Sequence, residues 1–348
     1  MTSPNPLVGA VLVKNGKVIG KGYHKKAGLP HAEIEAFQDA RQSKRNIKGS
    51  TLYVTLEPCC HTGKRTPPCV NSIIEEKVSR VVISALDPNP KVSGKGAAAL
   101  RKSGIEVHAG VLEEKSIKIN EAYNKYITTG LPFVVLKLAA TLDGNIAAAS
   151  GDSKWIGSET QRKYAHIMRS RADGVMVGID TVLTDNPSLN VRLKSRAGRN
   201  PVPIVLDSGL RTPPGSKLIK IHSDPVIATT RPVDKTRRER LTAQGARVLT
   251  VRKDKSGRVD LRELARLLGE LEFMSVLIEG GSKVAAEALR SGIVDKFTFF
   301  YAPKIVGSGG IGMIGDLKIQ KIRDAIDLSG LAVKKIGSEF MVEGYIKK

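Results

Sequence analysis

Cysteine is scarce in this chain: three occur in 348 residues, all within EPCCHTGKRTPPC, residues 57–69. So few and so close, they do not form a disulfide framework and are typical of a metal or catalytic site in a reducing cytosol. No apolar run approaches the length of a membrane span, so we expect no transmembrane helix. The first residues, MTSPNPLVGAV, lack the basic n-region of a signal peptide. We therefore expect a cytoplasmic protein.

Aromatic and acidic residues are also few. Aromatics make up 4% of the chain, which leaves few platforms for stacking single-stranded bases. Acidic residues number 34 against 56 Lys and Arg, so the formal net charge is +22. Such a surface attracts polyanions or phosphorylated small molecules, although a solvated lysine-rich surface explains the charge equally well. We regard nucleic-acid binding as the less favoured interpretation.

Strand and helix patterns alternate along the whole sequence, which predicts an α/β protein. A chain of 348 residues exceeds one typical core, so two domains are expected. AVLVKNGKVIGKG predicts a hairpin that turns at Asn15-Gly16, and HAEIEAFQDARQ predicts a helix. A helix-like stretch, EEKSIKINEAYNKYITTG, precedes the boundary that we place between domains 1–128 and 132–348. The second domain closes with a predicted hairpin, LAVKKIGSEFMVEGYIK.

The cysteine segment combines with an upstream H-A-E to suggest a catalytic zinc site. Such a site uses three protein ligands and keeps one position open for water. His31, Cys59 and Cys69 supply suitable ligands, and Glu33 is spaced to lie beside the metal without binding it. H-x-E followed by P-C and a further Cys is the signature of zinc-dependent deaminases. Glu33 would then move protons between the metal-bound water and the substrate.

Two other interpretations of these residues remain open. One is a structural zinc site, which normally has four protein ligands and paired C-x-x-C spacing. No second cysteine pair exists here, and His61 is the only spare candidate. The other is a reactive thiol cluster to which His31 is unconnected. We favour the catalytic site because a structural site has no need of Glu33.

The second domain lacks a convincing dinucleotide fingerprint. Residues 307–312 match G-x-G-x-x-G, but no clear helix follows them, so a Rossmann domain is not expected. In MSVLIEGGSKVAAEAL a strand runs to Glu279, turns at Gly280-Gly281 and enters a helix near Ser282. Backbone N–H groups at such a helix start can hold a phosphate, although a simple tight turn has the same pattern.

Several motifs, in order, resemble the bifunctional deaminase–reductase of riboflavin biosynthesis. TSPNPLVGAV, GYHKKAGLPHAE and the long cysteine spacing of EPCCHTGKRTPPC look like its deaminase half. KLAATLDGNIA, SKWIGS, GIDTVLTDNPSLNVR and LIEGGSKV look like its reductase half. The resemblance covers essentially the whole chain. It implies a cytidine-deaminase-like three-layer domain, then a dihydrofolate-reductase-like domain that uses NADPH.

The resemblance also implies roles for individual residues. In the deaminase half, His31, Cys59 and Cys69 would bind Zn²⁺, Glu33 would be the proton donor, and the pocket would be lined by Asn5, His24, His61 and Lys64. In the reductase half, the positions that match the nucleotide site are Ala139, Trp155, Thr181, Asp185, Ser208, Gly281, Ser282, Lys283 and Val284. Those that match the substrate site are Ser153, Arg169, Leu189, Arg192 and Glu279. Arginine also suits a sugar phosphate on chemical grounds, because its guanidinium binds oxygens as a fork.

The chain departs from the family pattern in two places. The family has eight residues between its cysteine ligands, whereas Cys59 and Cys69 enclose nine; we place the extra residue at Lys64-Arg65. The alternative is that Cys60 is the ligand, and we prefer Cys59 because it follows Pro58. The family also has a helix ahead of T-x-P-N-P, and this sequence starts almost on that segment.

The resemblance predicts two consecutive steps of riboflavin biosynthesis on a phosphorylated pyrimidine. The first is hydrolytic deamination at zinc, and the second is reduction of the ribosyl side chain by NADPH. A homo-oligomer without a membrane or nucleic-acid partner is expected. The alternatives are a chain that retains only one of the two activities, and a nucleic-acid deaminase with an appended binding domain.

Overall fold

The computed structural model describes residues 2–60, 68–193, 199–231 and 234–347. They form two compact units, Met1–Gly130 and Leu131–Lys348. His61 and Lys64 lie outside the described residues. Among the described helices, none is both long and apolar enough to cross a membrane.

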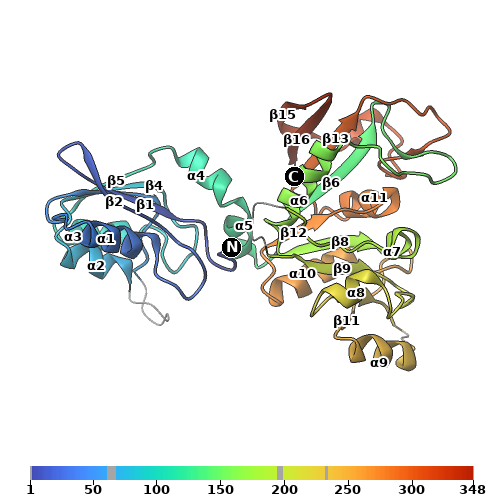
Figure 1. Cartoon of the computed structure of the whole chain (residues 1–348), viewed down its shortest axis with the longest axis horizontal. Helices are drawn as coiled ribbons and strands as arrows, with labels where there is room; N and C mark the ends of the chain where they lie inside the picture. Colours follow the sequence, from blue (N-terminus) through green and yellow to red (C-terminus); the bar gives the residue numbers. More distant parts are fainter. Residues whose placement is uncertain (1, 61–67, 194–198, 232–233, 348) are drawn as a thin grey trace. The chain divides into compact units, whose positions relative to one another are not determined.

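The first unit is built on a five-stranded sheet of order β2-β1-β3-β4-β5. Helices α1, α2 and α3 lie along one face, and α4 contacts β4 from the other, so the unit has three layers (Figure 1). The elements are β1 (Gly9–Lys14), β2 (Lys17–Tyr23), α1 (Ala32–Gln42), β3 (Thr51–Leu56), α2 (Cys69–Glu75), β4 (Arg80–Ala85), α3 (Lys95–Lys102), β5 (Glu106–Ala109), α4 (Glu113–Ile119) and α5 (Glu121–Thr129).

Most of these elements follow the sequence pattern. The hairpin β1–β2 turns at Asn15-Gly16, where both residues have positive φ. The helix-like stretch after residue 112 is not one helix but two, because Asn120 separates α4 from α5. The Asn120 side chain accepts from Leu7 N (2.8 Å) and donates to Leu7 O (2.9 Å). Asn120 thereby holds the segment that enters β1.

The second unit is built on a nine-stranded sheet of order β11-β10-β9-β8-β12-β6-β13-β16-β15. Its elements are β6 (Phe133–Thr141), β7 (Asn145–Ala147), α6 (Glu159–Arg169), β8 (Gly174–Gly178), α7 (Ile179–Asp185), β9 (Val202–Leu206), α8 (Lys217–Ile221), β10 (Val226–Thr229), α9 (Lys235–Ala243), β11 (Arg247–Thr250), α10 (Leu261–Glu270), β12 (Ser275–Ile278), α11 (Ser282–Arg290), β13 (Lys296–Ala302), β14 (Ile311–Gly312), the 3₁₀ turn η1 (Ile322–Asp324), β15 (Leu328–Ile336) and β16 (Glu339–Ile346).

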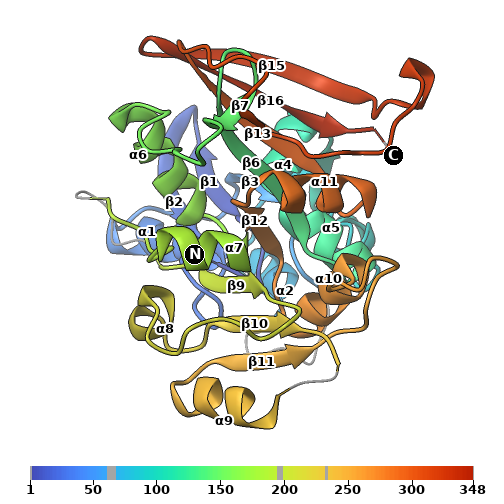
Figure 2. The same cartoon turned by 90° about the vertical axis from the view of Figure 1, so that its right-hand side faces the viewer.

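Seven neighbouring strands of this sheet, from β11 to β13, are parallel, and the closing hairpin β15–β16 adds antiparallel to β13. Figure 2 shows β15 and β11 at opposite ends of the sheet. One apolar core packs α10 and α11 on one face, and a second packs α7, α8 and α9 on the other. Every residue of β8 is buried, as expected for a central parallel strand.

Candidate functional sites

The first unit brings His31, Cys59 and Cys69 together. Their ligand atoms lie within 4.8 Å of one another. Among the described residues, this is the one group of His, Cys, Asp or Glu side chains that could hold a metal ion. His31 Nδ1 is 3.1 Å from Cys69 Sγ and 3.6 Å from Cys59 Sγ. Cys60 follows in the chain but does not belong to this group. One imidazole and two thiols are the donor set of a catalytic zinc site, so the residues present fit the metal.

Local structure explains why these side chains meet. His31 is the N-cap residue of α1, Cys69 is the first residue of α2, and Cys59 follows β3. The backbone N–H of Cys69 is 3.5 Å from Cys59 Sγ. Backbone N–H groups at a helix start carry partial positive charge, which favours a thiolate over a thiol.

A hydrogen bond between the two buried thiols shifts their pKa values in opposite directions. The pKa of Cys59 is lowered to about 3, first because the Cys69 thiol hydrogen-bonds to its sulfur and also because His31 does so. The pKa of Cys69 is raised by its hydrogen bond to Cys59 and by burial. Because the two sulfurs are close, ionising both to thiolates is unfavourable, since the two negative charges repel each other. A divalent cation bound between them would remove this repulsion.

Glu33 lies in the first turn of α1 and is 3% exposed. Burial raises the pKa of its carboxyl group above the ordinary value, and the charge of Cys59 adds to this. A raised pKa brings a carboxyl group closer to neutrality, where a proton carrier works best. Glu33 therefore has the burial and the environment of a general acid–base beside the ligand cluster.

Two of the predicted pocket residues lie next to the cluster. The His24 ring is 5.4 Å from the His31 ring, edge to face, and is buried. His24 Nδ1 is 3.0 Å from the carbonyl oxygen of Pro30, and Nε2 is 3.0 Å from Asn5 Nδ2. The carbonyl requires Nδ1 to be the protonated nitrogen, so Nε2 accepts from the Asn5 amide. Neither residue is on the open surface, although an isolated histidine such as His24 is usually expected there.

Glu57 supports the site, and the sequence analysis did not assign it a role. Its buried carboxylate accepts from the backbone N–H groups of Asp87 (3.2 Å), Gly94 (2.9 Å) and Ala97 (2.9 Å). These bonds tie the turn that carries Cys59 to the loop after β4 and to the start of α3. A Cβ at Gly96 would lie 2.1 Å from the carbonyl oxygen of Pro58, so only glycine fits this contact. The sequence feature that could have indicated this role is the acidic residue directly before Pro58-Cys59.

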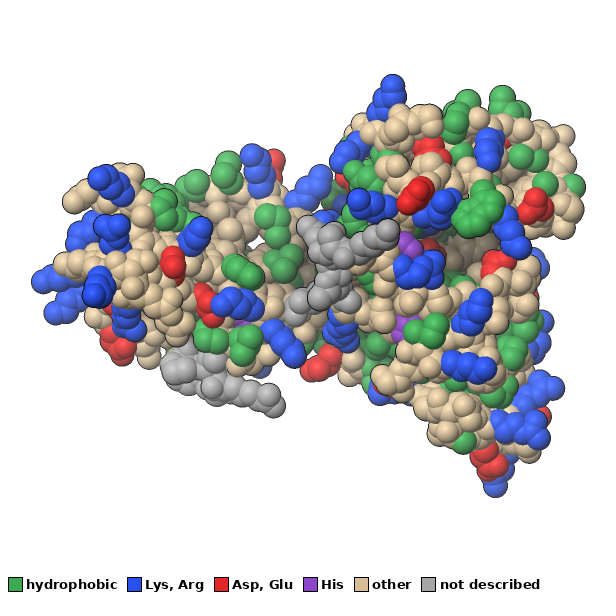
Figure 3. Space-filling model, in the orientation of Figure 1, with side chains coloured by type: hydrophobic (Ala, Val, Ile, Leu, Met, Phe, Trp, Pro, Cys, Tyr) green, Lys and Arg blue, Asp and Glu red, His purple; other side chains and the backbone are tan. Residues whose placement is uncertain are grey.

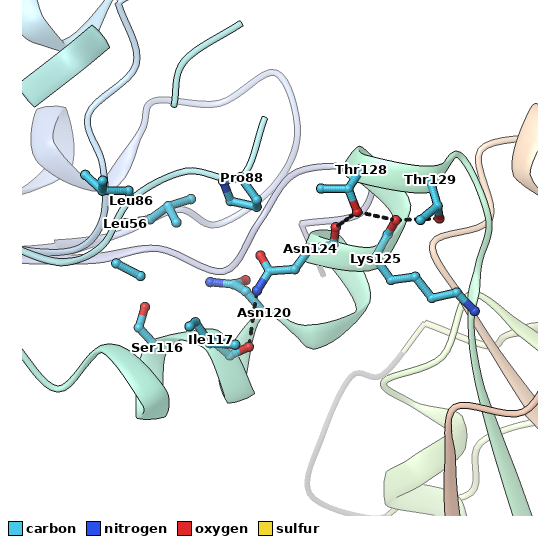
Figure 4. Close-up of a pocket in the computed structure, with 11 residues that line it drawn as sticks. Leu56, Leu86, Pro88, Ser116, Ile117, Asn120, Asn124, Lys125, Thr128 and Thr129 are labelled. Carbon is cyan, nitrogen blue, oxygen red and sulfur yellow. Dashed lines mark hydrogen bonds between the residues drawn. The ribbon is translucent and has the colours of Figure 1, made fainter. Parts of the chain in front are cut away.

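A cavity of about 390 Å³ lies at the carboxyl ends of β3 and β4. Leu56, Leu86 and Pro88 line one side, and residues of α4 and α5 line the other (Figure 4). Its lining is mostly apolar and includes none of the ligand-cluster residues. Asn120 belongs to this lining and also holds Leu7, so the cavity wall helps to place the segment that carries Asn5.

In the second unit the candidate residues gather at the carboxyl edge of the parallel sheet. The chain goes from β6 to β8, continues outward to β11, and returns with β12 between β8 and β6. Ligands of open α/β sheets bind outside the carboxyl ends of the strands at such a reversal. The residues placed there are Ala139 on β6, Thr181 in α7 after β8, and the Gly281–Val284 turn into α11 after β12.

The Gly280-Gly281 turn packs tightly at this edge. A Cβ at Gly280 would lie 2.9 Å from Val284 Cβ, and a Cβ at Gly178 would lie 2.9 Å from Val284 Cγ2. Glycine at both strand ends therefore lets the first turn of α11 approach β8 and β12. Gly281 is the N-cap of α11 and no side chain caps it, so its first N–H groups suit a phosphate.

A buried ionic group lies at the same edge. Arg169 Nε is 2.6 Å from Glu279 Oε1, and Arg169 Nη2 is 2.9 Å from Oε2. Lys137 Nζ, on β6, is 3.7 Å from Glu279 Oε2. Burial raises the pKa of Glu279, but Lys137 and Arg169 outweigh it, so the pKa lies below its ordinary value. Burial lowers the pKa of Lys137, and Glu279 offsets this only in part.

Lys137 was missed by the sequence analysis. Its signal was a single lysine in the apolar strand FVVLKLAAT, which could equally have been an exposed edge position. Arg169 was expected at a sugar phosphate, but its fork is occupied by Glu279 and its Nη1 is 3.3 Å from Asn190 O. Arg192 is exposed and donates to Ser188 Oγ (2.7 Å) and Asn190 Oδ1 (3.1 Å).

The other predicted residues are more dispersed. Trp155 is 68% exposed, with the Arg162 guanidinium 4.5 Å from its ring centre. Ser153 and Asp185 are exposed, Leu189 is buried, and Ser208 follows β9 with its Oγ accepting from Val259 N (3.2 Å). Thr181 and Asp185 are one helical turn apart and share a face of α7.

The glycine-rich segment 307–312 is a loop after β13, as predicted, and contains the short strand β14. The Asp143 carboxylate accepts hydrogen bonds from the Thr141 hydroxyl, from Gly307 N (2.7 Å) and from Val306 N (3.1 Å). The Thr141 bond is the largest cause that lowers the pKa of Asp143 to about 2, and the two backbone bonds add to it. Gly315 N donates to Ser282 O (3.0 Å). The loop therefore ends beside the start of α11.

Comparison with known proteins matches each unit to a domain family. The sequence pattern of the RibD C-terminal domain matches residues 132–345, and that of the cytidine and deoxycytidylate deaminase zinc-binding region matches residues 1–85. The riboflavin biosynthesis protein RibD of Aquifex aeolicus is 43% identical over 341 residues, which cover 98% of this chain and 92% of that protein. The RibD protein of Escherichia coli is 36% identical over 349 residues, which cover 97% and 92%.

A solved structure is similar over nearly the whole length. The diaminohydroxyphosphoribosylaminopyrimidine deaminase/5-amino-6-(5-phosphoribosylamino)uracil reductase of Thermotoga maritima superimposes with a TM-score of 0.86 at 39% identity, covering 99% of this chain and 93% of that one. Both halves are therefore present in the family's order. The chain belongs to the RibD family of riboflavin biosynthesis, bifunctional enzymes that join a zinc-dependent deaminase to an NADPH-dependent reductase.

Proposed function

We propose that the first unit removes the 2-amino group of 2,5-diamino-6-(5-phosphoribosylamino)pyrimidin-4(3H)-one as ammonia. The second unit then reduces the ribosyl group of the product with NADPH, giving 5-amino-6-(5-phosphoribitylamino)uracil. The His31, Cys59 and Cys69 cluster with Glu33 beside it is the observation that carries the first step. The Thermotoga maritima relative is named for the same two activities.

In the deaminase step, His31, Cys59 and Cys69 would hold zinc, which when bound lowers the pKa of a water molecule to about 7. Glu33 would accept the proton of the attacking water and would donate protons to the ring nitrogen and to the leaving amine. Its buried position raises the pKa of the carboxyl group, which favours a role as proton carrier. Asn5 and His24, fixed to each other beside the cluster, position the pyrimidine. His61 and Lys64 are assigned to this pocket on the resemblance alone.

In the reductase step, the start of α11 would bind the cofactor pyrophosphate, and the rest of the nucleotide site would be lined by Ala139, Trp155, Thr181, Asp185 and Ser208. NADPH would supply the hydride to C1′ of the sugar, the bond between C1′ and the ring oxygen would break, and that oxygen must gain a proton. Lys137 is the donor that we assign, because burial lowers its pKa and so makes its ammonium group a stronger acid. Glu279, locked by Arg169, keeps Lys137 in place. Ser153, Leu189 and Arg192 complete the substrate side, where Arg192 suits the phosphate.

We further propose a cytoplasmic homo-oligomer. β15 is an outer strand of nine residues, of which all but Ile336 are exposed, and Leu331 and Val333 are 61% and 70% exposed. Long apolar edge strands tend to pair with a second chain. Antiparallel pairing of two copies about Leu331 places Asp327 of one opposite Lys335 of the other, whereas parallel pairing aligns like charges.

The distribution of surface charge bears on nucleic-acid binding. On the face in Figure 3, Lys and Arg are scattered over both units, which does not favour a continuous nucleic-acid track.

The test is one assay on purified, zinc-loaded protein with the diaminopyrimidine ribosyl phosphate. Ammonia release is followed first, and NADPH is then added and its absorbance followed. We expect ammonia, then NADPH oxidation that depends on the deaminated product. Ammonia without oxidation would limit the chain to the first step, and the absence of both signals would refute the proposal.

A further inference from the structure

Three segments that are distant in sequence lie side by side at the carboxyl edge of the second sheet. β12, β8 and β9 are consecutive neighbours, all parallel. They are followed by the first turn of α11, the first turn of α7, and the loop 207–212, respectively. Neighbouring strands are about 4.8 Å apart, so the start of α11 and the loop after β9 are separated by about 10 Å.

The loop after β9 has a fixed shape. Asp207 Oδ2 accepts from both the backbone N and the Oγ1 of Thr212, each at 2.7 Å, which closes the loop on itself. The carbonyl oxygen of Ser208 accepts from Thr229 Oγ1 (3.2 Å) and Thr230 Oγ1 (3.0 Å), which ties the loop to the end of β10. Arg211 is the one cationic residue in this closed loop, and its side chain is 52% exposed.

Two cations from different segments face one carboxylate at this edge. Arg211 Nη2 is 3.2 Å from Asp180 Oδ1, and Lys283 Nζ is 3.8 Å from Asp180 Oδ2. Asp180 lies in the first turn of α7 and Lys283 lies in the first turn of α11. Two positive charges against one negative charge leave a net positive charge. The exposed pairs are weak, so either cation can turn to a new anion at little cost.

We propose that Arg211, assisted by Lys283, binds the 2′-phosphate of NADPH and so selects NADPH over NADH. This inference rests on the proposed reductase function. With the pyrophosphate at the start of α11, the adenosine ribose would extend across β8 towards the loop after β9, which carries Arg211 and lies about 10 Å from that start. A guanidinium fork matches two phosphate oxygens. NAD-specific sites instead offer an acidic residue to the ribose hydroxyl, and the acidic residue here, Asp180, is already engaged by both cations.

The test is Arg211→Gln, with KM and kcat measured for NADPH and for NADH on the deaminated substrate. Loss of one charge-assisted phosphate contact corresponds to about a 10- to 100-fold rise in the KM for NADPH. The KM for NADH, kcat and ammonia release should not change. An equal rise for both cofactors, or no rise for NADPH, would overturn the proposal, as would a wild-type enzyme that uses both equally well.

Arg247→Gln is the matched control. Arg247 forms an exposed pair with Asp224, with Nη2 2.6 Å from Oδ2, but lies at the amino ends of β10 and β11. It should leave both KM values unchanged. Calorimetric binding of 2′,5′-ADP and 5′-AMP separates this proposal from the reductase assignment. Preferential binding of 2′,5′-ADP that Arg211→Gln abolishes supports the 2′-phosphate site even if turnover fails, and equal binding of the two nucleotides refutes it.

Discussion

The two sites of this protein are built in different ways. The candidate deaminase site concentrates its chemistry in four side chains, three of them at the starts of α1 and α2 and the fourth, Cys59, in the loop after β3. The residues assigned to the reductase site spread along the edge of a parallel sheet, where the structure has tight backbone turns, glycine and a buried ionic group. The first needs particular residue types at particular spacings. The second needs particular positions in space, which many sequences can supply.

The largest expected effect breaks one site and spares the other. Glu33→Gln keeps the shape of the side chain but cannot carry the proton, so ammonia release should fall about 10²- to 10⁴-fold. Zinc content and NADPH oxidation on supplied deaminated substrate should remain at the wild-type level. Metal analysis and the two rate assays check this, and near-normal deamination would remove Glu33 from the mechanism.

A second experiment sharpens the metal side. Cys59→Ser should lose most of its bound zinc, because it removes a ligand from the buried cluster. Cys60→Ser is the matched neighbour and should keep its zinc, since Cys60 lies outside that cluster. Metal content after dialysis against a weak chelator distinguishes the two, and the reverse result would assign the ligand to Cys60.

A third experiment addresses the distributed site. Lys137→Gln should lower the reductase kcat about 10- to 100-fold and leave ammonia release intact. The lysine donates only in its charged form, which exists below its pKa, and burial lowers that pKa from 10.5. The wild-type rate should therefore decline as pH rises through this lowered pKa, while the variant shows no such decline. A variant that retains the wild-type pH profile would exclude Lys137 as the donor.

The smallest expected effect concerns the outer strand β15. Asp327→Lys and Lys335→Asp should each shift the oligomer towards monomer by placing like charges opposite each other. The double variant should restore the wild-type state, because antiparallel pairing brings the exchanged charges together again. Light scattering after gel filtration measures this. A wild-type monomer, or a double variant no better than the single ones, would contradict pairing through β15.

Much of the fold followed from sequence patterns. The β1–β2 hairpin, α1 and the closing β15–β16 hairpin carried clear turn or periodicity signals. Helix α6 was not predicted, although it carries Arg169, because its apolar residues do not stand out from a polar sequence. The break at Asn120 was not predicted, and the Asn120 side chain bonds there to Leu7, more than a hundred residues earlier, a contact that no local pattern specifies.

The sequence by itself predicted the metal chemistry, because histidine and cysteine are common zinc ligands and only three cysteines and six histidines occur in this chain. Only the tertiary structure decided which neighbours act on them. It showed that Glu57 fastens the Cys59 turn, that Arg169 is paired with Glu279, and that Lys137 is buried beside that pair. These roles depend on charge and distance between strands whose pairing no local pattern specifies, so they are visible only when the chain is folded.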